Sequence, residues 1–483
     1  MMENGRNKNL EEAAYDFFCE ISKIPRGSGN ERAISDYLAA FAKKNNWEVF
    51  QDTSFNVLIR KSGSKGRENE APLILQAHMD MVCEKNEDTK HDFLKDPIVP
   101  YIDGDWVKTK GTTLGADNGS GVAMILAILA SSNLSHPPLE MLMTTLEETG
   151  CVGAAKFDPS PLKGNRLINL DGAEEGLFVS SCAGGIVTDI AIPVKYENAK
   201  AGFSSYNLMI KSLTGGHSAC DIDKGRANAN ILAARLLDKL FDEGIRLVEI
   251  KGGAKMNAIP RECTAVISFE ENRLDKIKSI AAQTEAAFKA NYPSEKELRV
   301  TLEKTASSGS VMESDSQKRV INTILGIPCG VQSMSSNIKG LVQTSNNPGV
   351  ITSSEDKVVL TTFLRSSNYA EMESVSGKIT ATANEFGAKV QKSEGFPIWE
   401  YKADSPLRET MCAVYEEMYG KAPVITGTHG GLECAIFAKN IPNSDLATIG
   451  GPDIRDMHSP DERMSLSSFN RTCNFLARVL EKL

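Results

Sequence analysis

Residues 73–80 read Leu-Ile-Leu-Gln-Ala-His-Met-Asp, a short apolar run that ends in an imidazole and a carboxylate. The apolar part predicts a buried strand, and residues two apart on a strand point to the same side. We therefore expect His78 and Asp80 to lie within hydrogen-bonding distance. A metal-binding histidine needs such an acceptor, because it fixes the tautomer and the ring orientation. A core histidine satisfied by a neighbouring aspartate gives the same local pattern, so this stretch alone leaves both interpretations open.

A second candidate group is a glycine-rich loop, residues 113–121, which reads Thr-Leu-Gly-Ala-Asp-Asn-Gly-Ser-Gly and precedes an apolar helix predicted over 122–130. Glycines before a helix N-terminus let the backbone approach something small and charged. Phosphate is disfavoured, because the loop lacks a phosphate-binding G-x-x-x-x-G-K-[ST] pattern and Asp117 would repel an anion. A carboxylate at this point favours a cation, and a plain helix cap is the alternative.

A third group is the acidic pair Glu147-Glu148, which follows a strand predicted over residues 139–146. Adjacent side chains on an extended backbone point to opposite sides, so the two carboxylates cannot bind one ion equivalently. One can act as a ligand while the other is free to move protons. A surface acidic pair is the alternative, and the apolar strand that runs directly into the pair argues against it.

Two more strand ends carry similar groups. Asp171 follows a strand predicted over 166–170, and His458 lies beyond another near residue 447. Ligands of open α/β sheets bind at the carboxyl ends of the strands. The resulting set of two imidazoles and several carboxylates suits Zn²⁺, Co²⁺ or Mn²⁺. Five ligands are too many for one open tetrahedral ion, whereas two ions sharing a carboxylate use all five; they are His78, Asp117, one of Glu147 and Glu148, Asp171 and His458.

The elements that must position these residues predict an α/β fold. A mixed-sheet domain with helices on both faces is expected to consist of residues 1–185 and 397–483. Residues 186–396 mix alternating strands with amphipathic helices and lack a comparable cluster of acidic strand ends, which indicates an inserted α+β domain. Its two parts, near 186–305 and 306–396, resemble each other weakly.

Composition narrows the function class further. The chain has 483 residues, a net charge of −9 and no basic cluster, which disfavours a nucleic-acid partner. No apolar run is long enough for a membrane span, and the first 20 residues do not resemble a signal peptide. Ten cysteines without a disulfide-like spacing favour a reduced, cytoplasmic setting. His91 and His136 lie in polar or proline-rich loops and are expected to be solvated.

Several motifs in the same order resemble the M20 family of co-catalytic metallopeptidases. They are Gln76-Ala-His-Met-Asp-Met-Val, Leu114-Gly-Ala-Asp-Asn-Gly-Ser-Gly-Val-Ala, Glu147-Glu-Thr-Gly, Asn169-Leu-Asp, Gly215-Gly-His-Ser, Asn257-Ala-Ile-Pro-Arg and Met457-His-Ser-Pro-Asp-Glu. The resemblance covers nearly the whole chain and implies a zinc-peptidase type of catalytic domain with an inserted lid. It is closest to the dipeptidases of the family, which implies metal-activated hydrolysis of Xaa-His or other dipeptides.

The resemblance also implies a role for each candidate. Asp117 bridges two divalent metal ions, most simply Zn²⁺, with Glu148 and His458 completing one site and His78 and Asp171 the other. Asp80 orients His78, and Glu147 is the general base. The residues alone do not choose between Glu147 and Glu148.

For the inserted domain the resemblance implies that His217 polarises the scissile carbonyl and that Asn257 and Arg365 hold the substrate carboxylate. Gly431 and Glu433 belong to a Gly-Gly-Leu-Glu-Cys loop in the return segment of the catalytic domain, where Glu433 would hold a free α-amine. The partners implied are a small peptide and a second copy of the chain. Without the resemblance, each of these residues has an ordinary surface or turn interpretation.

Two rival functions remain from the sequence. Other activities of the same family, such as tripeptidase, carboxypeptidase or N-acyl amino acid deacylase, share the metal motifs. A metal-dependent binding protein without catalysis is a rival of another class, and it would normally lack the base or a ligand. Both are present here.

Overall fold

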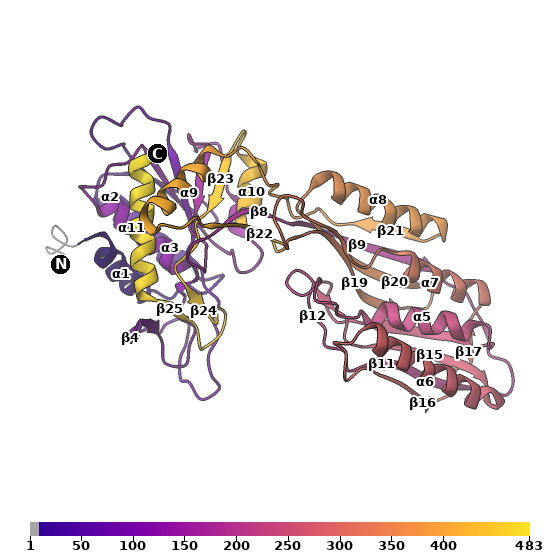
Figure 1. Ribbon diagram of the computed structural model, residues 1–483. Coiled ribbons are helices and arrows are strands. Elements are labelled where there is room, and N and C mark those ends of the chain that lie inside the picture. The colour runs from indigo at the N-terminus through magenta and orange to yellow at the C-terminus, as the bar shows by residue number, and fades with distance from the viewer. Residues whose placement is uncertain (1–8) are drawn as a thin grey trace. The chain divides into compact units, whose positions relative to one another are not determined.

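The computed structural model describes residues 9–483, which form two compact units (Figure 1). Unit 1 runs up to Cys182 and resumes over Tyr401–Gly427 and Leu432–Leu483. Unit 2 consists of Ala183–Glu400 and Thr428–Gly431. The four residues Thr428–Gly431 thus belong to unit 2, although the sequence suggested that the return segment from 397 is continuous with the first unit.

Unit 1 is built on an eight-stranded mixed sheet. The strands pair in the order β1-β2-β6-β3-β7-β23-β8-β22. The central run β6-β3-β7-β23 is parallel. The pairs β1-β2, β2-β6 and β23-β8 are antiparallel. The strands span β1 Glu48–Gln51, β2 Val57–Lys61, β3 Leu73–His78, β6 Leu139–Thr144, β7 Arg166–Asn169, β8 Leu177–Cys182, β22 Val424–Thr428 and β23 Asp445–Thr448. The predicted mixed α/β fold is confirmed.

Helices cover both faces of this sheet. Leu75 and Ala77 of β3 join the main core together with residues of α1 (Leu10–Ile21), α2 (Arg32–Lys44), α3 (Ala116–Ala130), α9 (Pro406–Tyr419) and α11 (Leu466–Lys482). Gln76 alternates with them and faces the other side, where its amide contacts Glu433 at the start of α10 (Glu433–Asn440). α10 contacts the short α4 (Val152–Lys156). The parallel strands are therefore buried from both sides.

Local sequence explains the ends of these helices. Asn9 caps α1 by accepting from the Glu12 amide at 3.0 Å, and Ser465 caps α11 in the same way. α9 has Pro406 at its first position and ends at Gly420, whose φ of 67° suits glycine. The helix α3 is buried along nearly its whole length, which explains why its sequence is apolar all round.

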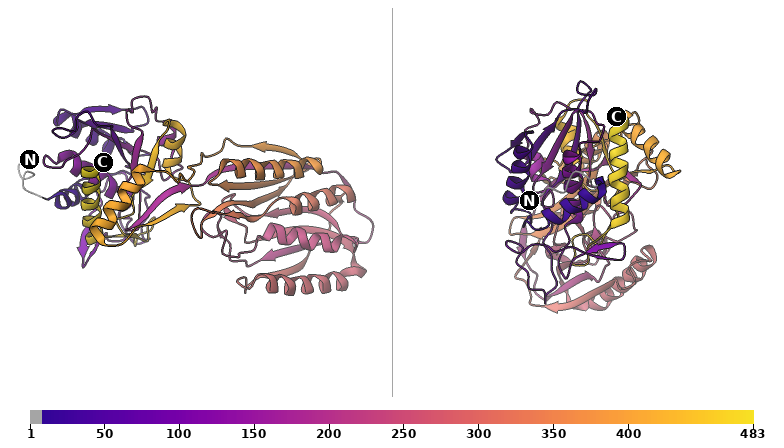
Figure 2. Two further views of the ribbon diagram at one scale, coloured as in Figure 1. Left: turned by 45° about the horizontal axis from the view of Figure 1, so that its top comes forward. Right: turned by 90° about the vertical axis from the view of Figure 1, so that its left-hand side faces the viewer.

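Unit 2 contains one continuous sheet of the order β16-β11-β15-β13-β19-β20-β9-β21, with β18 beside β19. Its strands span β9 Gly184–Pro193, β11 Phe203–Lys211, β13 Arg246–Gly252, β15 Cys263–Glu270, β16 Arg299–Thr305, β18 Gly330–Met334, β19 Val342–Ser353, β20 Lys357–Ser366 and β21 Lys389–Lys392. Four helices contribute to its core and lie side by side along the sheet (Figure 2). They are α5 Ala229–Phe241, α6 Leu274–Asn291, α7 Ser314–Gly326 and α8 Tyr369–Glu385. The short 3-10 helix η1 Glu271–Arg273 precedes α6.

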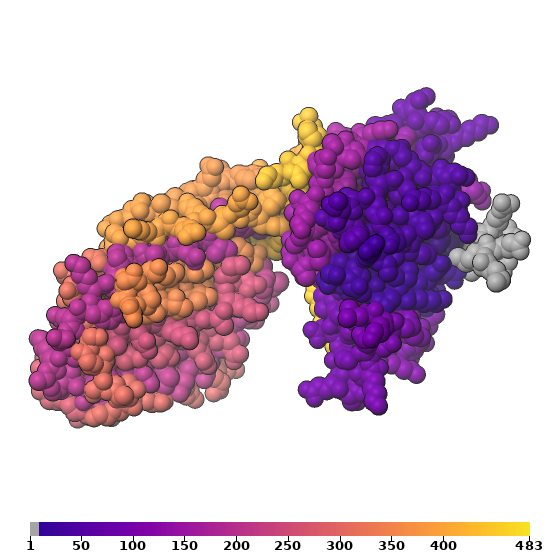
Figure 3. Space-filling view, turned by 180° about the vertical axis from the view of Figure 1, so that it is seen from behind, coloured from indigo at the N-terminus to yellow at the C-terminus, as the bar shows by residue number. Residues whose placement is uncertain are grey.

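The two expected parts of unit 2 are joined within this sheet. Only the pair Gly252 and Ile351 connects β13 to β19 in strand register, so the two groups of strands meet at a narrow seam. The strand β9 lies between β20 and β21 and thus belongs with the later group, although it comes first in the chain. Figure 3 shows the same mixing on the surface, where early and late segments of unit 2 share one face.

Smaller pairings complete the two units. β4 (Tyr101–Asp103) and β5 (Trp106–Lys108) form a hairpin, which extends through β25 (Arg463–Ser465) to β24 (Ile454–Arg455). In unit 2, β10 (Tyr196–Asn198) pairs with β17 (Ser310–Met312), and β12 (Gly216–His217) pairs with β14 (Ala258–Ile259). Among the described residues, no helix combines the length and the apolar character that crossing a membrane requires.

The prediction of a solvated His136 is wrong. Its side chain is buried, and its Nδ1 lies 2.8 Å from the Pro137 carbonyl oxygen. Burial lowers its pKa, so the imidazole is neutral in the folded chain. His91 is half-buried, with its ring against Phe93. Loop composition misleads here, because the loop that carries His136 packs under the polar turn at Ser64.

Candidate metal centre

Five of the predicted ligands converge at the carboxyl ends of the strands of unit 1. His78 ends β3, Glu148 follows β6, Asp171 follows β7, and Asp117 lies in the first turn of α3. His458 comes from the segment between β24 and β25, beyond β23. The topology explains the meeting, because β6, β3, β7 and β23 are neighbouring parallel strands whose ends share one edge.

The carboxylate of Asp117 lies between the two imidazoles. Its Oδ1 is 3.1 Å from Nε2 of His78, and its Oδ2 is 3.3 Å from Nε2 of His458. A second carboxylate approaches each imidazole. Asp171 Oδ1 lies 3.6 Å from Nε2 of His78, and Glu148 Oε2 lies 3.1 Å from Nε2 of His458. The arrangement gives two groups of three ligands that share one carboxylate.

Asp80 touches both the imidazole and the acidic turn. Its Oδ1 lies 3.4 Å from Nδ1 of His78, which is the pairing expected from their spacing. It also accepts from the backbone amides of Glu147 at 3.1 Å and Glu148 at 3.3 Å and from the hydroxyl of Ser28 at 2.8 Å. This fully buried carboxylate therefore holds a histidine and a turn that lie far apart in the sequence.

The acidic pair Glu147-Glu148 lies on a turn, so the prediction of an extended backbone at these residues is wrong. β6 ends at Thr144, and the amides of Gly150 and Cys151 both donate to the carbonyl of Glu147. The two side chains still diverge: Glu148 faces His458, whereas the Glu147 carboxylate, among the described residues, accepts a hydrogen bond only from the Cys151 thiol, at 3.5 Å. One acid thus joins the imidazoles and the other stays beside them.

Charge and burial shift the pKa values of the cluster. Burial opposes ionisation of Asp117, but its contacts with His458 and His78 win and lower its pKa. The contacts with Asp117 and Glu148 raise the pKa of His458 to about 10. Burial raises the pKa of Glu147 to about 9, and neighbouring carboxylates add to this effect. The site is an acidic cluster that positive charge stabilises.

The donor set fits divalent cations. Single ligand atoms of His78, Asp117 and Glu148 all lie within 4.8 Å of one another. Glu148 Oε1 is buried and has no hydrogen-bond partner in the described part of the chain. A buried unpaired carboxylate oxygen beside two imidazoles is unfavourable unless a cation contacts it. Imidazole nitrogens with carboxylate oxygens and no thiolate suit Zn²⁺, Co²⁺ or Mn²⁺.

Three predicted residues gather in unit 2 around Ser218. The pairing of β12 with β14 brings His217 opposite Ala258, and the Ser218 amide donates to the carbonyl of Asn257 at 2.8 Å. Nε of Arg365 in β20 lies 3.3 Å from the Ser218 hydroxyl. Arg365 is only 8% exposed and has no carboxylate partner within the described residues, and burial lowers its pKa to about 10. The surroundings of Ser218 thus bring together His217, the backbone carbonyl of Asn257 and the guanidinium of Arg365.

The two predicted residues of the return segment are separated. Gly431 is exposed and belongs to unit 2, where a side chain would collide with the ring of Phe396. Glu433 belongs to unit 1 and is buried, accepting from Gln76 at 2.6 Å and Thr144 at 2.9 Å. Its Oε1 has no hydrogen-bond partner among the described residues, and burial raises its pKa to about 7. The position of Glu433 beside the acidic cluster keeps it a candidate for an amine.

Sequence reasoning missed two residues of the centre. The sequence assigns no role to Arg26, and Glu462 enters only as the last residue of the motif that contains His458. Both are buried next to the loop that carries Asp117. No local pattern identifies Arg26, whereas a carboxylate four residues after His458 could have been considered.

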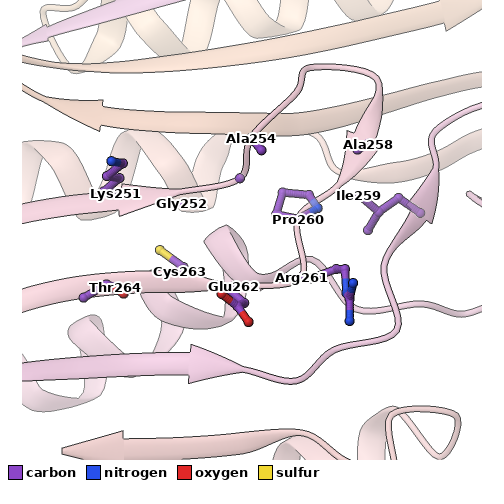
Figure 4. A pocket seen from close by; sticks show the side chains of 11 residues that line it. Lys251, Gly252, Ala254, Ala258, Ile259, Pro260, Arg261, Glu262, Cys263 and Thr264 are labelled. Atoms are coloured by element: carbon purple, nitrogen blue, oxygen red, sulfur yellow. The ribbon is translucent and has the colours of Figure 1, made fainter. Parts of the chain in front are cut away.

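A separate depression of about 510 Å³ lies in unit 2, between the end of β13 and the start of β15 (Figure 4). Its lining comes from one stretch of chain, residues 251–254 and 258–264, with Lys251, Arg261 and Glu262 as its charged members. It contains no histidine and a single carboxylate. It lacks the donor set of the cluster in unit 1.

Comparison with known proteins agrees with this geometry. Residues 74–482 match the model of the family described as Peptidase family M20/M25/M40. The chain belongs to this family. A cytosol non-specific dipeptidase of Escherichia coli is 38% identical over 471 residues, which cover 97% of each chain. The structure of an aminoacylhistidine dipeptidase from Vibrio alginolyticus is also 38% identical, with a TM-score of 0.91 over 99% of this chain and 98% of that one.

A more distant structure shares the fold and supports no more than that. The aminopeptidase PepT from Bacillus cereus matches with a TM-score of 0.56 at 16% identity over 98% of this chain. The combination of a mixed-sheet unit and a second α+β unit is thus common to this M20 chain and its relatives. The expected family resemblance is confirmed.

The metal centre predicts stabilisation by divalent cations. A cation that binds only the folded state raises stability by about 2.7 kcal/mol when its concentration is one hundred times the Kd. Zn²⁺ added to chelator-treated protein should therefore raise the Tm in differential scanning fluorimetry. His458→Ala should lose most of this rise, and the control His91→Ala, outside the cluster, should keep it. An equal rise in His458→Ala would contradict the ligand assignment.

Proposed function

We propose that this chain is a dinuclear-metal dipeptidase that hydrolyses Xaa-His or a broader range of dipeptides. The observation that carries the proposal is the carboxylate of Asp117, whose two oxygens each face a different imidazole with a further carboxylate beside it. The M20 membership and the names of two relatives, a cytosol non-specific dipeptidase and an aminoacylhistidine dipeptidase, support the substrate class.

The proposed ligands follow the two groups. Asp117 would bridge both ions, with Glu148 and His458 at one and His78 and Asp171 at the other. Zn²⁺ is the first candidate, and Co²⁺ and Mn²⁺ fit the same nitrogen and oxygen donors. When bound, the ions lower the pKa of a water molecule and polarise the scissile carbonyl.

Glu147 is the proposed general base. It lies in the same turn as Glu148 but forms no ion pair with either imidazole among the described residues, and its side chain is half-buried. Its carboxylate would take a proton from the water as the C–O bond forms, and would then pass it to the nitrogen of the leaving amine as the C–N bond breaks. Asp80 holds the backbone of this turn and the ring of His78 in place.

The groups of unit 2 fit recognition of a peptide terminus. We assign the carboxylate of the substrate to Arg365 and Asn257, because a guanidinium without an acidic partner in the described part of the chain offers a planar pair of donors. His217 is the proposed donor to the carbonyl oxygen, and Gly431 is assigned to a loop that contacts the substrate. Glu433, whose Oε1 is unpaired, is the proposed holder of the α-amine.

Two rivals are distinguished by specific groups. The unpaired oxygen of Glu433 favours a substrate with a free α-amine over an N-acyl amino acid, and the substrate panel below tests the length of the peptide. A binding protein without catalysis has no need for Glu147, whose carboxylate is held beside the ligands without joining them. We therefore keep peptide hydrolysis as the function, in a cytoplasmic setting.

Replacing the base should separate catalysis from metal binding. Glu147→Gln should lower kcat at least 100-fold, since a positioned general base contributes roughly 10²–10⁴-fold. Its cation stoichiometry, measured by elemental analysis, should stay at that of the parent chain. Glu174→Gln, an exposed acid of the same unit, is the matched control and should keep full activity. Unchanged kcat in Glu147→Gln would disprove the assignment of the base.

A substrate panel tests the specificity. The Zn²⁺-loaded chain should hydrolyse β-Ala-His and Gly-Gly, and it should act much more slowly on a tripeptide and on N-acetyl amino acids, which lack the free amine or the length expected. Amine release followed by chromatography measures each rate. Fast deacylation without dipeptide cleavage would favour the rival M20 activity.

We also propose a homodimer, which the family resemblance implies. Sedimentation velocity of the full chain should give a mass of about twice the 52.4 kDa of one chain. A single species at the mass of one chain at micromolar concentration would contradict this proposal.

A further inference from the structure

Two buried charged residues lie beside the metal centre without joining its ligands. Arg26 is 2% exposed and Glu462 is 3% exposed. Removing such charges from water is costly, so their retention requires a compensating set of contacts. Both residues direct their polar atoms at the backbone of the segments that carry the ligands.

Glu462 binds the loop that leads into Asp117. Its carboxylate accepts four consecutive backbone amides, from Leu114 at 2.8 Å, Gly115 at 2.9 Å, Ala116 at 2.8 Å and Asp117 at 3.3 Å. A carboxylate that accepts several amides fixes the path of a loop more firmly than a single bond does. The loop that presents the shared carboxylate is therefore held by a side chain from a distant part of the sequence.

Glu462 belongs to the same short segment as His458. Its own amide donates to the carbonyl of Ser459 at 3.1 Å, and the segment is bounded by the strands β24 and β25. The carboxylate thus ties the segment of His458 to the loop of Asp117. These two residues meet at Oδ2 of Asp117, 3.3 Å from Nε2 of His458.

Arg26 makes the corresponding link to the other imidazole. Its Nη1 donates to the carbonyls of Met79 at 3.1 Å and Asp80 at 3.3 Å, directly after His78, and its Nη2 donates to the carbonyl of Gly115. A Cβ at Gly115 or Gly119 would come within 2.6 Å or 2.5 Å of this Nη2, so a side chain at either position would displace the guanidinium. The guanidinium joins the end of β3 to the Asp117 loop.

We propose that Arg26 and Glu462 are positioning residues for the shared carboxylate, each fixing Asp117 relative to one of the two imidazoles. The inference rests on the proposed dinuclear function and deepens it, because it names what sets the relation between the two cation sites. Glu462 links Asp117 to His458, and Arg26 links Asp117 to His78. Within the described part of the chain, the hydrogen bonds of both side chains go to backbone groups, so each would act through the backbone.

A general contribution to stability is the alternative, and the chain offers a matched control for it. Glu140 is another buried carboxylate of unit 1, which accepts the amides of Lys163 and Gly164 and pairs with Arg60. It lies near the start of β6, whereas the ligands lie beyond its end. Replacing Glu140 should therefore reduce stability without changing cation affinity.

The test measures Zn²⁺ affinity of the full-length chain by competition with a chromophoric chelator. Glu462→Gln preserves size but turns an amide group towards donors, and it should weaken at least one of the two binding steps tenfold or more. Glu462→Asp, which keeps the charge, should recover part of the affinity. Arg26→Lys should also weaken binding, because an ammonium cannot reach all three carbonyl partners of the planar guanidinium. Glu140→Gln should bind Zn²⁺ as the parent chain does.

The outcomes separate this inference from the proposed function. A parent chain that binds fewer than two cations overturns the dinuclear function itself. A parent chain that binds two, with Glu462→Gln binding both equally well, overturns only the positioning role. If neither Glu462 variant folds, while Glu140→Gln does, the carboxylate serves the stability of the unit and the positioning role is again overturned.

Discussion

The structure depends on gathering several carboxylates around two imidazoles in a partly desolvated place. Asp117, Glu147, Glu148 and Asp171 lie close enough for their charges to interact, and Glu433 is buried beside them. Like charges at low effective dielectric repel one another strongly, so the cluster can form only if positive charge and hydrogen-bond donors balance it. The two imidazoles supply part of that balance, and divalent cations suit the remainder. The fold must therefore hold these groups together against their own repulsion.

The parallel strands bring the charged groups together. Neighbouring strands end at one edge of the sheet, so residues 78, 148 and 171 meet although up to 93 positions separate them. This part could be predicted from the sequence, because an apolar run followed by an acidic or imidazole residue is a local pattern. The role of Asp80 was predictable for the same reason, since it depends on a spacing of two residues.

Other features could not be predicted, because they depend on contacts between distant segments. Arg26 looks like part of a turn, and only the folded chain shows that its guanidinium lies against the end of β3 and the Asp117 loop. The turn at Glu147 was expected to be extended, because local sequence does not reveal that Asp80 binds its amides. His136 was expected in water, because the packing of its loop is likewise a tertiary effect. The grouping of β9 with the last strands of unit 2 has no local pattern either.

Unfavourable backbone conformations are concentrated in the segments that bring the carboxylates and imidazoles together. Eight residues other than glycine have positive φ in the described part of the chain, and four of them, Leu146, Cys151, Asp456 and His458, lie in the two segments that carry Glu148 and His458. Such conformations are unfavourable and persist only where surrounding contacts determine them. Here the contacts are the amides bound by Asp80 and the carbonyl of Glu147, together with the link through Glu462. The unfavourable backbone conformations and the hydrogen bonds that hold them thus lie in the same segments. This is expected if Asp80 and Glu462 serve to fix the arrangement of the ligands rather than to stabilise unit 1.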